Sequence, residues 1–292
     1  MPFADRRTEV AGRPVAYVDE GPRDAPPLVL LHGAGFDHAE LTWRLTVAAM
    51  RGRHRVIVPD LPGYGDSAAL DGRPDLPGLG EWAVHFLDAV GVGSADLGGV
   101  SMGGGMALWI AIHAPERVNH LIGVCPYGLM ARAPHHRLAW AAWRAGALPL
   151  AYRVAAASPR AARLGLSLSY GDPRRVSRNA VAELRATARQ QAQRRSFDAF
   201  LAAEMTRSGL KSDLTQELHR IMAPTLLLAG RFDRLVPAVH LKRARARIPD
   251  CRYLALPTGH WPMRERPELF QQALSSFLSS APRRTDPIDA GT

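Results

Sequence analysis

Apolar and polar positions follow two alternating patterns along the first 126 residues of the chain. Short, mostly apolar runs predict strands, and stretches in which apolar residues recur about every 3.6 positions predict helices. The predicted strands are 27–31, 55–58, 95–100 and 118–124, and the predicted helices are 39–50, 81–90 and 102–113. Residues 10–20 predict a hairpin whose turn contains Gly12, Arg13 and Pro14. Because alternating strands and helices are typical of βαβ units, we expect a mostly parallel sheet.

This alternation stops at Pro126 and resumes near residue 223. The segment between is helical in pattern and contains no strand-like run. Beyond it the pattern predicts strands over 223–229 and 251–256 and helices over 239–247 and 267–278. We therefore expect an α/β core in two parts, residues 1–126 and 221–280. A helical cap over 127–220 separates them, and a flexible tail over 281–292 follows.

Composition narrows the class of protein. The chain of 292 residues is 47% apolar, enough for a sizeable core, yet no apolar run reaches the length of a membrane span. The first residues lack the apolar stretch of a secretory signal. Cys125 and Cys251 lie in or beside strand-like runs, without the close Cys or His neighbours of a metal site. We expect two buried thiols, no metal and a cytoplasmic protein.

The net charge of +10 is confined to the predicted cap. Residues 127–220 contain 16 basic and 6 acidic residues, whereas the rest of the chain contains 21 of each. Only Lys211 and Lys242 are lysines, so the excess is almost entirely arginine. Because no nucleic-acid-binding module is visible, we do not expect a nucleic-acid partner. Two interpretations stay open: a solvated arginine-rich surface, or attraction of anionic small-molecule substrates.

The first chemical motif is Gly-Val-Ser-Met-Gly at residues 99–103. It joins a predicted strand to a predicted helix, and its glycines allow the sharp turn that would lift Ser101 above the sheet edge. A serine hydroxyl becomes a nucleophile when a base removes its proton. We therefore expect Ser101 to be the nucleophile rather than a simple helix N-cap.

A second motif, His-Gly-Ala-Gly at residues 32–35, ends an earlier buried strand. Its glycines, Gly33 and Gly35, let the backbone approach a ligand, so both are candidate substrate-binding residues. The Ala34 N–H could join the Met102 N–H at the helix start as an oxyanion hole. The alternative interpretation is an ordinary turn.

The acid and the base come from the second part of the core. The acid could follow the strand after the Ser101 helix or the next strand. No Asp or Glu occurs from His120 to Pro134, which excludes the first position, and Asp233 follows a strongly apolar strand at the second. His260 is the one histidine of eleven in a loop between the last predicted strand and the last predicted helix. We expect His54, His113 and His120 to lie at element ends in surface or packing roles. For Asp60 and Asp66 we expect capping and turn roles.

Taken together, the motifs give the chain order Ser, Asp, His, and the chain resembles the α/β-hydrolase superfamily from about residue 10 to 278. The matching segments are 32–35, 60–67, 99–103, Asp233 with Val236 and Pro237, and Gly-His-Trp-Pro at 259–262. The resemblance implies an eight-stranded, mostly parallel sheet flanked by helices, with a helical cap over the active site.

Within that superfamily the chain is similar to capped esterases, lactonases and carbon–carbon bond hydrolases. The serine at position 101 disfavours the aspartate-based dehalogenases and epoxide hydrolases. Val100 precedes it, where carbon–carbon hydrolases of the meta-cleavage kind usually have asparagine. That departure weakens the carbon–carbon interpretation.

Aromatic and aliphatic residues of the cap also bear on the substrate. Residues 136–157 predict a helix pair that includes Leu138, Trp140, Trp143, Leu148, Leu150, Tyr152 and Val154. They fit an inner face that closes an apolar pocket, or simple packing of the cap on the core. Trp140, Trp143 and Trp261 are candidate substrate-binding residues. A membrane-surface role is a further option, since arginines alternate with Trp and Leu here.

These residues predict a cofactor-independent serine hydrolase acting on an ester, lactone or related acyl bond. Ser101 would attack the carbonyl, His260 would accept the proton, and Asp233 would orient the imidazole. A non-hydrolytic reaction at the same site, such as cyclisation, acyl transfer or a lyase step, stays open. So does a ligand-binding protein with a vestigial triad. The oligomeric state is not predicted.

Overall fold

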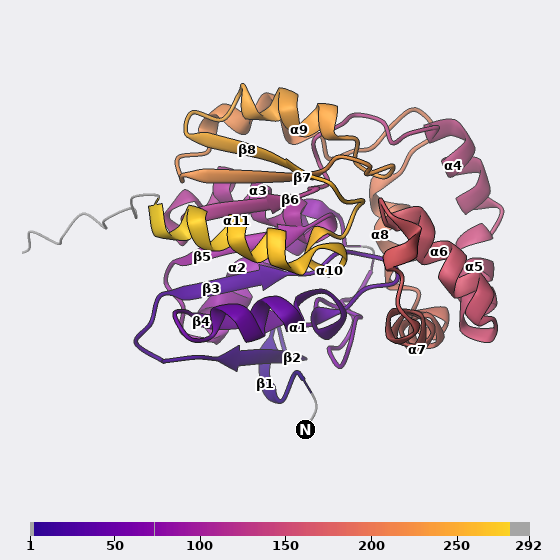
Figure 1. The fold of residues 1–292 in the computed structure, drawn as a ribbon, viewed down its shortest axis with the longest axis horizontal. Coiled ribbons are helices and arrows are strands. Elements are labelled where there is room, and N and C mark those ends of the chain that lie inside the picture. Colours follow the sequence, from indigo (N-terminus) through magenta and orange to yellow (C-terminus); the bar gives the residue numbers. More distant parts are fainter. Residues whose placement is uncertain (1–2, 73, 281–292) are drawn as a thin grey trace, which may run out of the picture.

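Eight strands form one sheet in the computed structural model, which describes residues 3–72 and 74–280 (Figure 1). The strand order is β1-β2-β4-β3-β5-β6-β7-β8, with β1 and β2 antiparallel and the strands from β4 to β8 parallel. In chain order the strands are Arg6–Val10, Arg13–Glu20, Pro27–Leu31, Arg55–Pro59, Ala95–Val100, Val118–Val124, Thr225–Gly230 and Cys251–Leu256. The predicted eight-stranded, mostly parallel sheet is confirmed.

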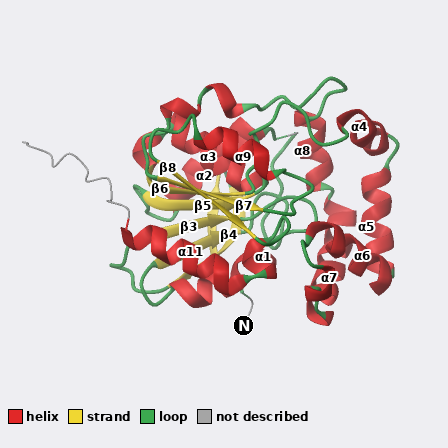
Figure 2. Ribbon diagram, turned by 45° about the horizontal axis from the view of Figure 1, so that its top comes forward, coloured by secondary structure: helices red, strands yellow, loops and turns green. Residues whose placement is uncertain are grey.

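Helices cover both faces of this sheet (Figure 2). Helices α1 (Ala39–Met50) and α11 (Pro267–Ser280) pack together on one face, where Trp43 and Phe270 are buried with ring centroids 6.1 Å apart. The other face carries α2 (Leu76–Ala89), α3 (Met102–His113) and α9 (Ala238–Arg245). Because both faces are covered, strands such as β5 and β7 are buried along their whole length, which explains why most of their residues are apolar or glycine.

Five helices are inserted between β6 and β7 and lie beyond the carboxyl ends of the strands (Figure 1). They are α4 (His136–Arg144), α5 (Ala147–Ala157), α6 (Pro159–Ser169), α7 (Arg178–Arg194) and α8 (Ser196–Glu204). Short 3-10 turns follow at Pro173–Arg175, Leu214–Gln216 and Leu218–Arg220, and another precedes β6 at Pro115–Arg117. These helices occupy the segment predicted as the cap.

The buried Glu204 fastens the end of the cap to the core. Its carboxylate accepts hydrogen bonds from the Leu76 N–H at 2.8 Å, the Tyr127 hydroxyl at 2.8 Å, and the N–H and hydroxyl of Ser212. Leu76 begins α2, so the carboxylate also satisfies a free N–H at a helix N-terminus. The cap therefore contacts the core through a fully bonded buried group.

Among the element boundaries that differ from the prediction, two have a clear physical cause. The hairpin turns at Ala11 and Gly12, both with positive φ, which matches a two-residue hairpin turn, and Arg13 and Pro14 belong to β2. Helix α2 begins five residues before the predicted start, because the Asp75 side chain caps the Gly78 N–H and stabilises a glycine-rich first turn. The predicted tail, 281–292, lies outside the described residues.

No described helix is long and apolar enough to cross a membrane.

Candidate active site

Ser101 occupies a strained turn between β5 and α3. Its φ of 54° and ψ of −118° fall in a region that residues with a side chain rarely adopt. Three backbone hydrogen bonds hold it there: the Ser101 N–H donates to the Val124 carbonyl, and the Ser101 carbonyl accepts from Gly105 and Tyr127. A Cβ at Gly99 or Gly103 would collide with backbone atoms. The two motif glycines thus allow the turn that presents Ser101.

The strain at Ser101 predicts that removing its side chain will stabilise the fold, although it also removes the proposed nucleophile. Replacing Ser101 with glycine relieves the positive φ, so we expect the free energy of unfolding to rise by about 1 kcal/mol. Urea denaturation of both proteins measures it. Ala11→Gly is the matched control, because Ala11 also has a positive φ, of 51°, but lies in the hairpin turn. A Ser101→Gly protein that is less stable than wild type, when Ala11→Gly is not, would contradict backbone strain at Ser101.

The loop after β3 lies against this turn. A Cβ on Gly33 would be 3.4 Å from the Ser101 Cβ. The loop is held from two sides: the Gly33 N–H donates to Asp37 at 2.8 Å, and the His32 Nε2 accepts from the Leu61 N–H at 2.9 Å. Burial lowers the pKa of His32, so its ring is neutral and structural.

Two backbone N–H groups at this place have no hydrogen-bond partner among the described residues. They belong to Ala34 in the loop and to Met102, the first residue of α3. A free N–H at the start of a helix lies at the positive end of its dipole. These groups suit an anionic oxygen next to Ser101.

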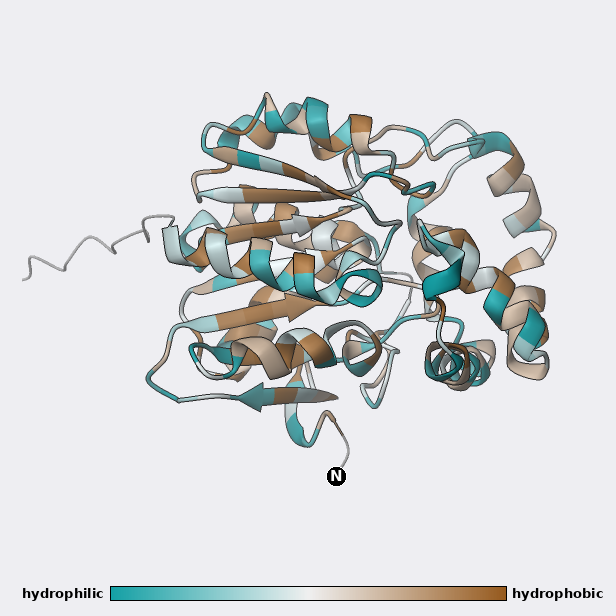
Figure 3. Cartoon of the chain, in the orientation of Figure 1, coloured by the Kyte–Doolittle hydropathy of each residue, from teal (hydrophilic) through white to brown (hydrophobic). Residues whose placement is uncertain are grey.

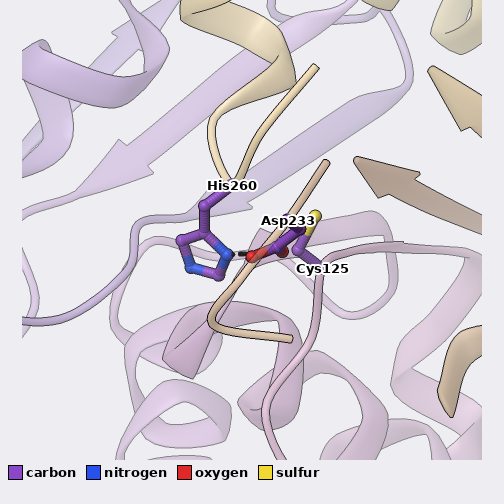
Figure 4. Close-up of side chains that lie close together, drawn as sticks. All are labelled: Cys125, Asp233 and His260. Atoms are coloured by element: carbon purple, nitrogen blue, oxygen red, sulfur yellow. Dashed lines mark hydrogen bonds and ion pairs between the residues drawn. The ribbon is translucent and has the colours of Figure 1, made fainter. Parts of the chain in front are cut away.

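Asp233 and His260 form a buried pair (Figure 4). The His260 Nδ1 lies 2.7 Å from the Asp233 Oδ2, and the N–H groups of Leu235 and Val236 donate to the other carboxylate oxygen. Burial opposes ionisation of Asp233, but the paired imidazole and these N–H groups outweigh it and lower the carboxyl pKa. Because an ionised carboxylate only accepts, the Nδ1 carries the proton and the Nε2 is left as a base.

All three predicted residues lie at one edge of the sheet. Ser101 follows β5, Asp233 follows β7 and His260 follows β8, and these strands are parallel members of the run β5-β6-β7-β8. Within the described residues, no hydrogen bond joins the Ser101 hydroxyl to the imidazole. The structure thus brings Asp233 and His260 into direct contact and places Ser101 at the same edge.

A sequence profile described as the alpha/beta hydrolase fold matches residues 26–267. The chain belongs to the α/β-hydrolase family. One relative is the dihydrolipoyllysine-residue acetyltransferase component of the acetoin cleaving system of Pseudomonas putida, 31% identical over 94% of this chain and 69% of that protein. A 2-hydroxymuconate semialdehyde hydrolase of Pseudomonas putida is 30% identical over 96% of each chain. The 3-oxoadipate enol-lactonase 1 of Acinetobacter baylyi is 26% identical over 94% of this chain and 96% of that protein.

Cys125, expected from its sequence pattern only to be a buried thiol, lies against the Asp233–His260 pair. It follows β6, and its sulfur lies with the Asp233 carboxylate and the His260 ring within a 4.8 Å span (Figure 4). Burial, and then the charge of Asp233, raise the pKa of the thiol well above its usual value. A protonated thiol is a poor metal ligand, so the residues here fit packing against the acid better than metal binding. Cys251 is only partly buried, which corrects the expectation for that residue.

Glu265 connects the loop of His260 to the inserted helical segment of this α/β hydrolase. The buried carboxylate accepts from the Gly259 N–H at 2.7 Å, and from Gly171 and Asp172 of the cap at 2.9 and 2.8 Å. The His260 N–H also donates to the carbonyl of Ser169, 2.7 Å away. Sequence reasoning missed Glu265, because a glutamate near a helix end usually lies on the surface.

Glu265→Gln should therefore lower both stability and turnover, although the sequence pattern would place this glutamate on the surface. One acceptor oxygen becomes a donor that faces backbone N–H groups, so we expect about 2 kcal/mol less stability. Displacement of the His260 loop should lower kcat about tenfold or more. Denaturation and ester kinetics measure both effects. Glu268→Gln, on the exposed start of α11, is the control and should change stability by less than about 0.5 kcal/mol.

The predicted substrate-binding residues fall in two places. Gly33 and Gly35 lie in the loop beside Ser101, where a Cβ on Gly35 would be 3.5 Å from the Phe197 ring of the cap. Trp261 is buried next to His260. Trp140 and Trp143, together with Arg144, Arg194 and Arg195, line a cavity of about 710 Å³ whose lining does not include the three catalytic candidates. Substrate contact by these five candidates stays a prediction.

The orientation of the cap helices corrects the predicted inner face. Leu138, Leu150 and Val154 are exposed, whereas Tyr152 is fully buried against Phe36. Helix α5 packs on α7 through the face that carries Tyr152 and Ala155, so the aliphatic residues point away. The predicted apolar inner face is therefore wrong for these three residues.

Other residues with predicted secondary roles also have clear positions. Asp60 accepts from the Ala39 N–H at the start of α1 and from the Asp66 N–H, which confirms a capping and turn role. His120 does not lie at an element end: it is buried within β6 and pairs with Asp96 at 2.8 Å. Neither residue belongs to the active site.

Proposed function

We propose that this α/β hydrolase cleaves an ester, lactone or related acyl bond of a mid-sized, partly apolar molecule through a covalent acyl-enzyme on Ser101. The observation that supports it most is the buried Asp233–His260 pair at the sheet edge that also carries the strained serine. The relative named as an enol-lactonase favours an acyl bond as the target.

In the proposed first step the Ser101 oxygen attacks the carbonyl carbon while the His260 Nε2 accepts the hydroxyl proton. Asp233 stays ionised and stabilises the imidazolium through Nδ1. The carbonyl oxygen becomes an oxyanion held by the N–H groups of Ala34 and Met102, each worth about 3 kcal/mol of transition-state stabilisation. Collapse of this intermediate expels the alcohol, which takes the proton from His260.

In the second step water attacks the acyl-enzyme. His260 accepts a proton from the water and returns it to the Ser101 oxygen as the acid leaves. No cofactor or metal takes part in these steps. We further propose residues 127–220 as the cap that closes this site, and the cytoplasm as its compartment, because both cysteines are free thiols.

A panel of p-nitrophenyl esters tests this proposal. The acyl chain is varied in length, and each length is assayed with and without a terminal carboxylate, for wild type and Ser101→Ala. The proposal expects turnover that depends on Ser101 and incorporates one ¹⁸O atom from labelled water. Product without label would instead indicate cyclisation, acyl transfer or a lyase step. Indifference to the carboxylate would remove attraction of anionic substrates by the cap.

Carbon–carbon bond hydrolysis is a second candidate, favoured by the relative named as a 2-hydroxymuconate semialdehyde hydrolase, which matches along nearly the whole chain. Val100, in place of the asparagine usual before the serine of those enzymes, opposes it. Assays with 2-hydroxymuconate semialdehyde distinguish the two. A higher kcat/KM for this compound than for every ester in the panel would favour carbon–carbon cleavage.

A further inference from the structure

The outer helices of the cap carry exposed aliphatic side chains that nothing in the catalytic proposal uses. Leu138 on α4, Leu150 on α5 and Leu164 on α6 are 71%, 61% and 64% exposed. Val154 and Leu168 follow one turn after Leu150 and Leu164, so each of these two helices has an apolar stripe. Helices α4 and α5 lie on the side of the cap away from the sheet, and α6 packs beside α5 (Figures 1 and 2). We name these three helices the outer cap face.

Arginines are interspersed with this apolar surface. Residues 127–171 contain six arginines and no aspartate or glutamate. They are Arg132, Arg137, Arg144, Arg153, Arg160 and Arg163. In the part of the chain that the structure describes, none of the six forms an ion pair. Hydropathy colouring shows the same mixture of polar and apolar positions along α4 and α5 (Figure 3).

We infer that the outer cap face docks on the surface of a bilayer that contains anionic phospholipid. Exposed leucines enter the boundary between headgroups and acyl chains, and the unpaired arginines bind the phosphate groups around them. Amphipathic helices with arginines beside the apolar stripe have the composition that binds such an interface without spanning it. This inference goes beyond the proposed reaction and does not depend on it.

Charge argues against a second copy of the chain as the occupant. A two-fold dimer through this face would place its arginines against the same arginine-bearing face of the second copy. No acid within 127–171 could compensate them, so like charges would repel across the interface. A lipid surface supplies the missing negative charge and an apolar interior at once. An acidic soluble protein would pair with the arginines, but its charge gives no reason for the exposed leucines.

Flotation with lipid vesicles tests the inference on the full chain. Wild type is mixed with vesicles of pure phosphatidylcholine, or of phosphatidylcholine and phosphatidylglycerol at about 7:3, and the bound fraction gives a partition coefficient. We expect binding to the anionic vesicles at least tenfold stronger than to the neutral ones, falling as NaCl is raised. Equal partitioning into both vesicles, or none into either, overturns the proposal.

Two variants of the outer cap face separate the apolar and the charged contributions. Leu150→Ser with Leu164→Ser should lower partitioning at least tenfold, because both side chains lose their place in the acyl region. Arg137→Gln, Arg153→Gln and Arg160→Gln together should lower it about a hundredfold, at about fivefold per arginine. Unfolding midpoints and turnover of a short soluble ester check that both variants keep the native fold.

Matched controls lie on the core. Leu45→Ser with Met222→Ser removes two exposed apolar residues, and Lys242→Gln, Arg243→Gln and Arg245→Gln removes three charges from α9. Both controls should bind vesicles like wild type, and a loss equal to that of the cap variants overturns the proposal. Ser101→Ala should also bind normally, so vesicle binding and the proposed reaction fail or succeed separately.

The rival occupants give distinct results. Retention on immobilised polyglutamate that is unchanged in the leucine variant, without vesicle binding, would assign the face to an acidic protein. A wild-type dimer that becomes monomeric in the leucine variant, again without vesicle binding, would assign it to a second copy. Either result overturns docking on lipid.

Discussion

Replacing Ser101 with alanine will lower turnover of the best ester by at least three orders of magnitude. Alanine keeps the backbone of the turn but has no oxygen to form the acyl-enzyme. The Ala34 and Met102 N–H groups and the Asp233–His260 pair stay in place. The residual rate should therefore exceed that of uncatalysed hydrolysis, because oxyanion stabilisation survives.

Steady-state kinetics on one batch of wild type and variant measures this effect. The KM should change little, since the loss concerns a transition-state interaction. Ser177→Ala is a useful control: Ser177 caps α7 through the Ala180 N–H and lies in the cap. It should cost about 1 kcal/mol of stability and leave turnover within a factor of two. Turnover of Ser101→Ala near the wild-type rate would refute the nucleophile.

Asp233→Asn should lower kcat by about four orders of magnitude, comparable to the loss of the nucleophile. The carboxylate accepts the His260 Nδ1 proton, whereas an amide can present its NH₂ group and favour the opposite tautomer. The Nε2 would then hold a proton and could not accept the one from Ser101. Asp66→Asn, at an exposed ion pair with Arg7, should change kcat less than twofold.

The same variant has a stability signature that depends on pH. The pKa of Asp233 is lower in the folded enzyme than in the unfolded chain. Its ionised form therefore stabilises the fold above about pH 4, and that contribution is lost as pH falls through the folded value. Asp233→Asn should lose less stability than wild type between about pH 5 and pH 2. Parallel stability curves would contradict the lowered pKa.

The strands and the contact between Asp233 and His260 were accessible from sequence for the same reason. A parallel sheet covered on both faces favours mostly apolar strands, so β5 and β6 are found at the predicted residues although Asp96, Asn119 and His120 interrupt them. The residues that follow those strands are then brought to one edge by topology alone. That is why Asp233 and His260 could be named without coordinates. Helix α2 was placed too late, because Pro77, Gly78 and Gly80 resemble a loop until the cap of Asp75 is seen.

Supporting residues could not be found in this way. The roles of Cys125 and Glu265 depend on contacts with segments far away in sequence, and no local pattern distinguishes them from an ordinary core thiol or surface acid. The cap shows the same limit. The pattern of α5 contains both Tyr152 and Leu150 as apolar residues, and only its contact with α7 decides that Tyr152 turns inward. Because Tyr152 turns toward α7, Leu150 and Val154 of the outer cap face point to solvent.

The central claim is that the Ser101 hydroxyl, activated by the buried imidazole, is the atom that attacks. Reaction with a fluorophosphonate, followed by peptide mass spectrometry, tests it most directly. We expect one adduct per chain, on Ser101, absent in Ser101→Ala and formed at least a hundredfold more slowly in Asp233→Asn. An adduct on another residue, or ester turnover by a chain that never reacts with the probe, would contradict it.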